Sequence, residues 1–192
     1  MLLFILGLIL FFSVHSLTML VPGLRTKLID TYGIAVWKGV YALMAAVGLS
    51  LMVLAYGQLR LDSAMLYRSP LALRHVAILL MLPVFPLVVA SYLKGRIRVL
   101  LCGHPMLLAI VLWALAHLLV NGRVIDLLLF GSFLLWAVIS GYHKVRHATE
   151  QAEPVPVSWW GINDVLAVLI GLIVYAAFLG GLHSLLFGVS PI

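Results

Sequence analysis

Six long apolar runs, separated by short segments that hold most of the charges, are the feature that most constrains this chain. Only 9% of the 192 residues are charged and 65% are hydrophobic, whereas a soluble globular domain has about 25% charged residues. A helix needs about 20 apolar residues to cross a bilayer. We therefore expect an all-α, polytopic transmembrane helix bundle of about six spans, in one domain over residues 1–192. The expected spans are residues 1–20, 34–57, 71–93, 102–121, 124–142 and 164–186.

Prolines, glycines and polar segments predict where these spans bend, turn and end. Pro83 and Pro86 lie in the middle of the third run and predict a kink, because proline removes a helix hydrogen bond. Asn121 and Gly122 are a strong turn signal, so the fourth and fifth spans are expected to pair as a tight antiparallel hairpin. The polar segment 143–157 is expected to be the longest loop.

Two shorter polar segments mark the ends of further spans. Arg25, Lys27 and Asp30 are expected to form the first loop. Before the sixth span, Asn163 and Asp164 are expected to form the N-cap, because short polar side chains there accept hydrogen bonds from the first free N–H groups of a helix.

The distribution of basic residues predicts the partner and the orientation of the chain. The formal net charge is +6, but the lysines and arginines sit between the apolar runs, which indicates anionic lipid headgroups rather than nucleic acid. Expected loops one, three and five hold eight of these residues, and loops two and four hold four. Cytoplasmic loops carry the excess of positive charge, so both termini are expected on the periplasmic side. The single cysteine, Cys102, excludes an internal disulfide.

His117 is the residue of greatest functional interest, because a buried imidazole is costly in lipid unless it has a partner or a ligand. Trp113 and Asn121 lie four residues to either side, on the same helix face, and the three side chains form a candidate cofactor-binding stripe. His104 falls on a largely different face, about 20 Å away along the axis, and is expected at the cytoplasmic entrance of this span. The alternative is a structural role, in which His117 hydrogen-bonds a neighbouring helix.

His15 is the natural mate of His117, because it is the other histidine set within an apolar run, beside Phe11 and Phe12. Two neutral imidazoles from different helices suit haem iron as axial ligands. They suit zinc less well, because no thiol or carboxylate lies at comparable depth. At about 1.5 Å per residue, His15 is expected roughly 20 Å below the outer face and His117 roughly 10 Å below it. Joint ligation therefore requires tilted helices or a shifted first span.

Other polar residues near the span ends are weaker candidates. Arg74 at the start of the third span could clamp a cofactor propionate, and Asp164 could relay protons, although both also suit ordinary boundary positions. His75 and His183 lie near the outer ends of the third and sixth spans, where they are expected to meet each other or to face headgroups and water. The sequence shows no phosphate-binding loop, nucleophile triad or paired-carboxylate motif, so hydrolytic chemistry is not indicated.

Several motifs resemble the NnrU family of bacterial membrane proteins along nearly the whole chain. The resemblance implies one NnrU-like transmembrane domain in the bacterial inner membrane, associated with denitrification and nitric oxide metabolism. It implies no defined molecular activity. The motifs are F-F-S-V-H-S-L at residues 11–17, G-H-P-M-L-L-A-I-V-L-W-A-L-A-H-L-L-V-N-G-R at 103–123, L-L-L-F-G-S-F at 127–133, I-N-D-V-L-A-V-L-I-G-L at 162–172 and L-H-S-L-L-F-G at 182–188.

The chain is also similar to the 15-cis-ζ-carotene isomerases, membrane enzymes that hold haem b between two histidines for a redox-dependent isomerisation. Their R-H-P…W-C-L-A-H motif resembles G-H-P at 103–105 and W-A-L-A-H at 113–117. This implies that His117 and His15 are the axial ligands of haem b. Ala114 stands where the isomerases carry cysteine, a departure that weighs against carotenoid isomerisation. A weaker resemblance, to isoprenylcysteine-type membrane methyltransferases, rests on the same H-P pair, with glycine in place of their arginine.

These observations lead to one prediction and two alternatives. The leading prediction is an inner-membrane haem b protein connected with nitrogen-oxide metabolism, whose partners are membrane lipids and denitrification or electron-transfer proteins. One alternative is a haem-dependent isomerase or oxidoreductase-like enzyme related to the carotenoid isomerases. The other is a non-enzymatic accessory or assembly protein whose histidines join helices.

Overall fold

The computed structural model describes residues 1–21, 23–151 and 159–191, with the side chains of all of these except 147–151. The described residues are helical and form no strand, which confirms the all-α class. The chain divides into two compact units, residues 1–64 and 65–192, and each unit is described by itself. The helices are α1 (Leu2–Leu20), α2 (Leu24–Tyr32), α3 (Ile34–Asp62), α4 (Leu71–Met81), α5 (Val84–Ala90), α6 (Arg96–Leu100), α7 (Pro105–Val120), α8 (Val124–Gln151), α9 (Ile162–Ala177), the π-helical turn η1 (Phe178–Leu182) and α10 (His183–Phe187).

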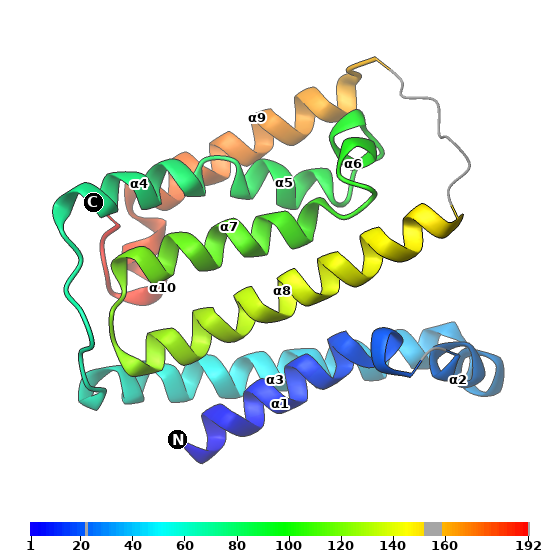
Figure 1. The fold of residues 1–192 in the computed structure, drawn as a ribbon, viewed down its shortest axis with the longest axis horizontal. Helices are drawn as coiled ribbons and strands as arrows, with labels where there is room; N and C mark the ends of the chain where they lie inside the picture. The colour runs from blue at the N-terminus through cyan, green and yellow to red at the C-terminus, as the bar shows by residue number, and fades with distance from the viewer. Residues whose placement is uncertain (22, 152–158, 192) are drawn as a thin grey trace. The chain divides into compact units, whose positions relative to one another are not determined.

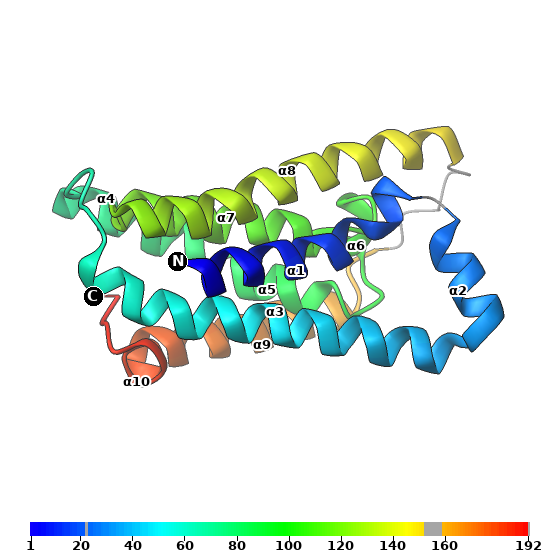
Figure 2. The same ribbon diagram turned by 90° about the horizontal axis from the view of Figure 1, so that it is seen from below.

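Unit 1 is a helical hairpin in which α1 and α3 pack along each other and the short helix α2 joins them (Figure 2). The two long helices approach closely at Gly7 and Gly48, since a Cβ on Gly7 would lie 2.8 Å from the Gly48 carbonyl oxygen. Small residues allow such close approach between membrane helices. The prediction of a first loop is wrong for residues 24–32, because they form α2. The leucines, arginine and lysine of this segment are good helix formers.

In unit 2, α7 is the central helix and lies between α8 on one side and α4 and α5 on the other (Figure 1). Helix α9 packs against α5. The sequence of α7 explains its place, because its 16 residues are apolar apart from one histidine, and a helix that is apolar all round is covered by other helices or by lipid. The buried residues of α7 are Pro105, Leu107, Ala109, Ala114 and Ala116.

The third apolar run is broken in its middle, which confirms the predicted kink. Helix α4 ends at Met81, and α5 begins at Val84 directly after Pro83. Pro86 then packs against Gly171 of α9, where a Cβ would lie only 2.5 Å from the Pro86 Cα. The absence of a side chain at Gly171 therefore allows α5 and α9 to touch along their backbones.

The fourth and fifth runs form the expected tight hairpin, because α7 ends at Val120 and α8 begins at Val124. Helix α8 is longer than expected and continues to Gln151, so the loop prediction is wrong for residues 143–151. Residues 152–157 of that predicted loop lie outside the described residues.

The segment before α4 lies across this hairpin turn. The backbone N–H of Leu66 donates to the Gly122 carbonyl at 2.7 Å, and the Tyr67 hydroxyl donates to the carbonyls of Leu118 and Asn121. A Cβ on Gly122 would lie 2.9 Å from the Tyr67 carbonyl carbon, so this approach requires glycine. Burial and the negative charge of a nearby carboxylate raise the pKa of Tyr67. The phenol therefore stays protonated and keeps donating to these carbonyls.

A buried carboxylate fixes the start of α9. Asn163 and Asp164 are the second and third residues of this helix and Gly161 is its N-cap, so the N-cap prediction is wrong. Asp164 is 2% exposed. Its carboxylate accepts hydrogen bonds from the backbone N–H groups of Gly161 at 3.1 Å, Arg96 at 3.0 Å and Ile97 at 2.9 Å. Asp164 thus joins the first turns of α6 and α9.

Five helical segments in the described ranges are long and apolar enough to cross a membrane, and α7 is a shorter apolar helix. The count of six spans and the periplasmic placement of both termini therefore stay predictions. Within unit 2, the end of α5 and the start of α7 lie on the side toward which α8 also runs at its end (Figure 1). Basic residues of the third and fifth expected loops belong to segments on this side. They include Lys94, Arg96, Arg98 and Lys144.

Candidate site at the C-terminal end of α7

The candidate site is built around His117 in the last turn of α7. Its Nδ1 lies 2.8 Å from the Trp113 carbonyl oxygen, one turn earlier. Because a carbonyl oxygen can only accept, Nδ1 carries the proton. The side-chain amide of Asn121 donates to the His117 carbonyl at 3.0 Å. Trp113, His117 and Asn121 thus contact one another at the end of α7, and their role in cofactor binding stays a prediction. The hydrogen bond at Nδ1 leaves Nε2 as the basic nitrogen, in a tautomer that can ligate a metal.

Aromatic rings enclose the His117 imidazole. Phe130 of α8 stacks on it, with ring centroids 4.6 Å apart and 27° between the planes. The Trp113 ring lies 5.0 Å from the imidazole and meets Phe130 and Phe133 edge-on at 5.1 and 5.4 Å. These rings fix the orientation of the imidazole, and they provide no strong acceptor or donor for Nε2.

A second imidazole, that of His183, completes the cluster. Its ring centroid lies 6.5 Å from that of His117, and the planes differ by 29°. Its Nδ1 lies 2.7 Å from the Val189 carbonyl oxygen, so it holds the same tautomer as His117. Among the described residues, neither Nε2 has a hydrogen-bond partner.

The structure adds a contact of His183 that the sequence did not predict. Its ring packs against His117 and Phe187, and its exposure to headgroups stays a prediction. His75 itself is exposed on α4. Sequence reasoning missed His183 as a site residue, although its L-H-S context repeats the V-H-S context of His15 at the other end of the chain.

His15 shows the same local arrangement in unit 1. Its Nδ1 lies 2.7 Å from the Phe11 carbonyl oxygen. Its ring stacks on Phe11 at 4.1 Å and lies 5.2 Å from Tyr41 of α3. Because His15 and His117 belong to units that are described separately, their pairing on one iron stays a prediction.

Two arginines lie toward the same end of unit 2 as the His117–His183 cluster. Arg74 is exposed in the first turns of α4, whose start is tied to the end of α7 through Tyr67. Arg123 lies in the α7–α8 turn, and its backbone N–H donates to the buried carboxylate of Asp126 at 2.9 Å. The role of Arg74 as a propionate clamp stays a prediction, and Arg123 is a second guanidinium at this end of the helices.

The number of ligands decides which group such a site could hold. The described residues contain no group of three or more His, Cys, Asp or Glu side chains that could hold a metal ion. A zinc site needs three or four protein ligands. Haem iron already has four porphyrin nitrogens and needs axial ligands alone. One or two imidazoles are therefore enough protein ligands for haem iron.

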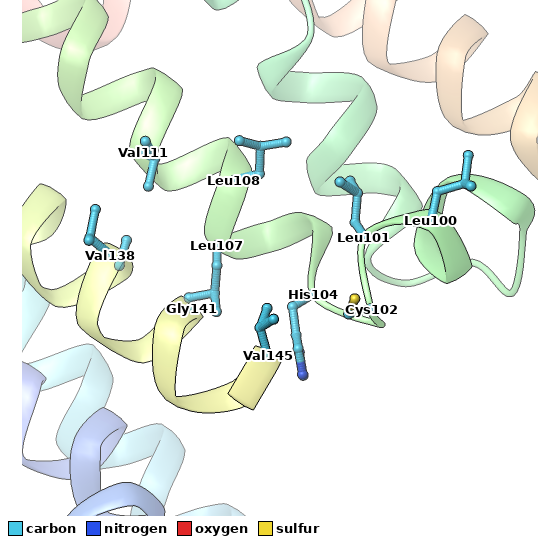
Figure 3. Close-up of a pocket in the computed structure, with 11 residues that line it drawn as sticks. Leu100, Leu101, Cys102, His104, Leu107, Leu108, Val111, Val138, Gly141 and Val145 are labelled. Carbon is cyan, nitrogen blue, oxygen red and sulfur yellow. The ribbon is translucent and has the colours of Figure 1, made fainter. Parts of the chain in front are cut away.

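A separate apolar groove opens at the other end of α7. It holds about 340 Å³, and Figure 3 shows His104 and Cys102 near its mouth, with side chains of α8 across from α7. Burial lowers the pKa of His104 below its usual value, and the positive charges of Lys144 and Arg98 lower it further. The expectation that His104 lies at the entrance of this span is thus in accord with its place before the first turn of α7.

The fold and the cluster together define a class, that of multi-pass helical membrane proteins with histidines inside their apolar helices. Within this class, residues 3–191 match the family model described as NnrU protein. The chain therefore belongs to the NnrU family, which its motifs predicted. Neither the curated proteins nor the solved structures include a match to the chain.

Proposed function

We propose that this NnrU family member is a haem b protein of the bacterial inner membrane that serves nitric oxide metabolism or denitrification, with His117 as one axial ligand. The observation that supports it best is the His117 imidazole, whose Nδ1 is bound to a backbone carbonyl and whose Nε2 is left without a partner among aromatic rings. An imidazole nitrogen that accepts no hydrogen bond and carries no proton has its lone pair available for a metal. That nitrogen in His117 is Nε2.

The residues around His117 have distinct roles in this proposal. The Trp113 carbonyl fixes the tautomer and makes Nε2 a better donor to a metal, as the outer hydrogen-bond partners of ligating histidines do. Phe130 and the Trp113 ring would hold the imidazole in place by packing against it. Haem b, when bound, would supply one-electron redox chemistry at this end of α7. Arg74 would hold a propionate, and the resemblance to the carotene isomerases points to His15 for the second axial position.

Two other functions compete with this one. Carotenoid isomerisation has less support, because Ala114 is fully buried in the packed face of α7 and no thiol stands where the isomerases carry one. A non-enzymatic accessory role would make His117 a packing residue, which its stacking on Phe130 also suits. That role predicts that replacing His117 weakens the fold and removes no cofactor.

Titration of the purified apoprotein with haem distinguishes these functions. The wild-type protein is expected to give a saturable Soret band. His117→Ala is expected to weaken haem binding at least about tenfold, which corresponds to about 1.4 kcal/mol. His75→Ala is the matched control, because that histidine is exposed on α4 of the same unit, and it should bind haem as the wild type does. Equal titration curves for His117→Ala and the wild type would reject the ligand assignment.

A further inference from the structure

We infer that His183 supplies the second axial imidazole, so that both iron ligands come from unit 2. This inference rests on the proposed haem function, and it replaces His15 with a residue that the structure brings to His117. The two histidines are far apart in sequence, and they meet because α10 returns the end of the chain to the last turn of α7.

The distance between the two rings suits a shared iron. Two metal–nitrogen bonds of about 2.0 Å, with roughly 1.2 Å from each nitrogen to its ring centre, place the centroids of two axial imidazoles about 6.4 Å apart. The His117 and His183 centroids are 6.5 Å apart. The rings share no hydrogen bond at this separation. The measured separation therefore matches the separation of two imidazoles that ligate one iron.

The hydrogen bonds of the two histidines are also matched. Each Nδ1 is held by a backbone carbonyl, at 2.8 Å from Trp113 and at 2.7 Å from Val189. Both rings therefore present Nε2 as the basic nitrogen, which is the atom that haem iron binds when Nδ1 is protonated.

The chain before His183 departs from regular helix in a way that determines where this imidazole points. Helix α9 gives way to the π-helical turn η1, and Gly181 within it has φ 133°. No atom lies within 4 Å of the position that a Cβ on Gly181 would occupy, so its backbone angle rather than close packing requires glycine. The chain therefore bends sharply at Gly181, two residues before His183.

The chain after His183 completes its support. Helix α10 ends at Gly188, which has φ 70°, and the next residue, Val189, offers its carbonyl to the His183 Nδ1. Two glycines with positive φ therefore flank one five-residue helix that begins with His183. Backbone conformations of this rare kind cluster at functional sites. Here they place the imidazole of His183 next to His117.

The spin state of ferric haem in single-histidine variants tests the inference. Iron with two axial imidazoles is low-spin, and loss of one strong axial ligand converts it to high-spin. In full-length protein from haem-replete cells, His183→Ala is expected to keep haem through His117 and to give a high-spin electron paramagnetic resonance signal. Excess imidazole should restore the low-spin signal. His15→Ala is the matched comparison and is expected to stay low-spin.

A second variant keeps the test valid if alanine at position 183 perturbs the fold. His183→Met offers iron a thioether, and methionine ligation raises the reduction potential relative to bis-histidine ligation. The expected result is a more positive midpoint potential with haem retained.

An unchanged potential and a low-spin signal in both position-183 variants would overturn the inference. A high-spin signal in His15→Ala that imidazole restores would overturn it in favour of His15. A wild-type protein that is folded and binds no haem would reject the proposed function itself.

Discussion

The two ends of α7 each carry a histidine, and the difference between them shows what makes an imidazole a candidate ligand. His104 precedes the first turn, beside an apolar groove and two cations that disfavour its charged form. His117 lies in the last turn, where a backbone carbonyl fixes its tautomer and aromatic rings enclose it. The sequence already predicts His104 at the entrance of the span and His117 inside it. The hydrogen bond and the second imidazole of His183 distinguish the His117 end.

Haem content is expected to show the largest difference between the two ends. We expect His117→Ala purified from haem-replete cells to retain less than about a tenth of the wild-type haem, since loss of a strong ligand bond costs well over 1.4 kcal/mol. His104→Ala is expected to retain the wild-type amount. The measurement is the ratio of Soret to protein absorbance. Equal haem loss in the two variants would remove the distinction between the ends.

Asp164 is expected to dominate stability at the His104 end of unit 2. Asp164→Ala leaves three backbone N–H groups of the α6 and α9 starts without their acceptor, which we expect to cost roughly 2–4 kcal/mol. The measurement is the thermal unfolding midpoint in detergent. Asp30→Ala is the control, because Asp30 is exposed on α2 and its loss should matter little. Similar midpoints for the two variants would show that the Asp164 contacts are not important for stability.

Replacing Gly122, at the His117 end of unit 2, is expected to lower the stability by less than replacing Asp164. A Cβ there would meet the backbone of Tyr67, so Gly122→Ala should displace the segment that crosses the α7–α8 turn and cost about 1–3 kcal/mol. Gly57→Ala on α3 is the control, since nothing lies within 4 Å of its Cβ position and alanine favours helix. Unfolding midpoints in detergent compare the two. A Gly122→Ala protein as stable as Gly57→Ala would show that the Tyr67 segment can move away from position 122 at little cost.

The pKa of His104 is expected to give the smallest signal. Lys144→Gln removes a nearby positive charge, so the pKa of His104 should rise toward its usual value, whereas Arg146→Gln should leave it unchanged. Nuclear magnetic resonance titration of labelled histidines in micelles measures both. No rise in Lys144→Gln would show that the charge of Lys144 does not lower the pKa of His104.

The same titration links His104 to the dependence of stability on pH. Because the folded pKa is lowered, the unfolded chain binds the proton first as the pH falls below about 6.5. The neutral His104 therefore contributes full stability above that pH, and this contribution is lost as the pH falls through the lower folded pKa. The acid-side loss should be smaller in Lys144→Gln than in the wild type.

Features set by local periodicity could be predicted from the sequence. The Trp113, His117 and Asn121 stripe follows from spacing by four residues along a helix. The break between α4 and α5 follows from Pro83, and the α7–α8 hairpin follows from its Asn-Gly turn. Each of these depends on a few neighbouring residues, so no tertiary information is needed.

Features that depend on tertiary contact could not be predicted. The sequence of the last apolar run predicts one continuous helix, yet a kink at Gly181 redirects the chain and brings His183 to His117. Asp164 reads as a helix cap, yet two of its three N–H partners come from the start of α6. The extension of α8 to Gln151 could have been predicted, because the segment contains Ala, Glu, Gln, Lys and Arg, which are good helix formers. It was predicted as a loop because it is polar.

The haem content of the wild-type protein tests the central claim most directly. Full-length protein is purified in mild detergent from haem-replete cells, and haem is quantified as its pyridine complex against protein concentration. The proposed function predicts a b-type spectrum at about one haem per chain. A folded, monodisperse preparation with no Soret band, and no gain of one when haem is added, would contradict it.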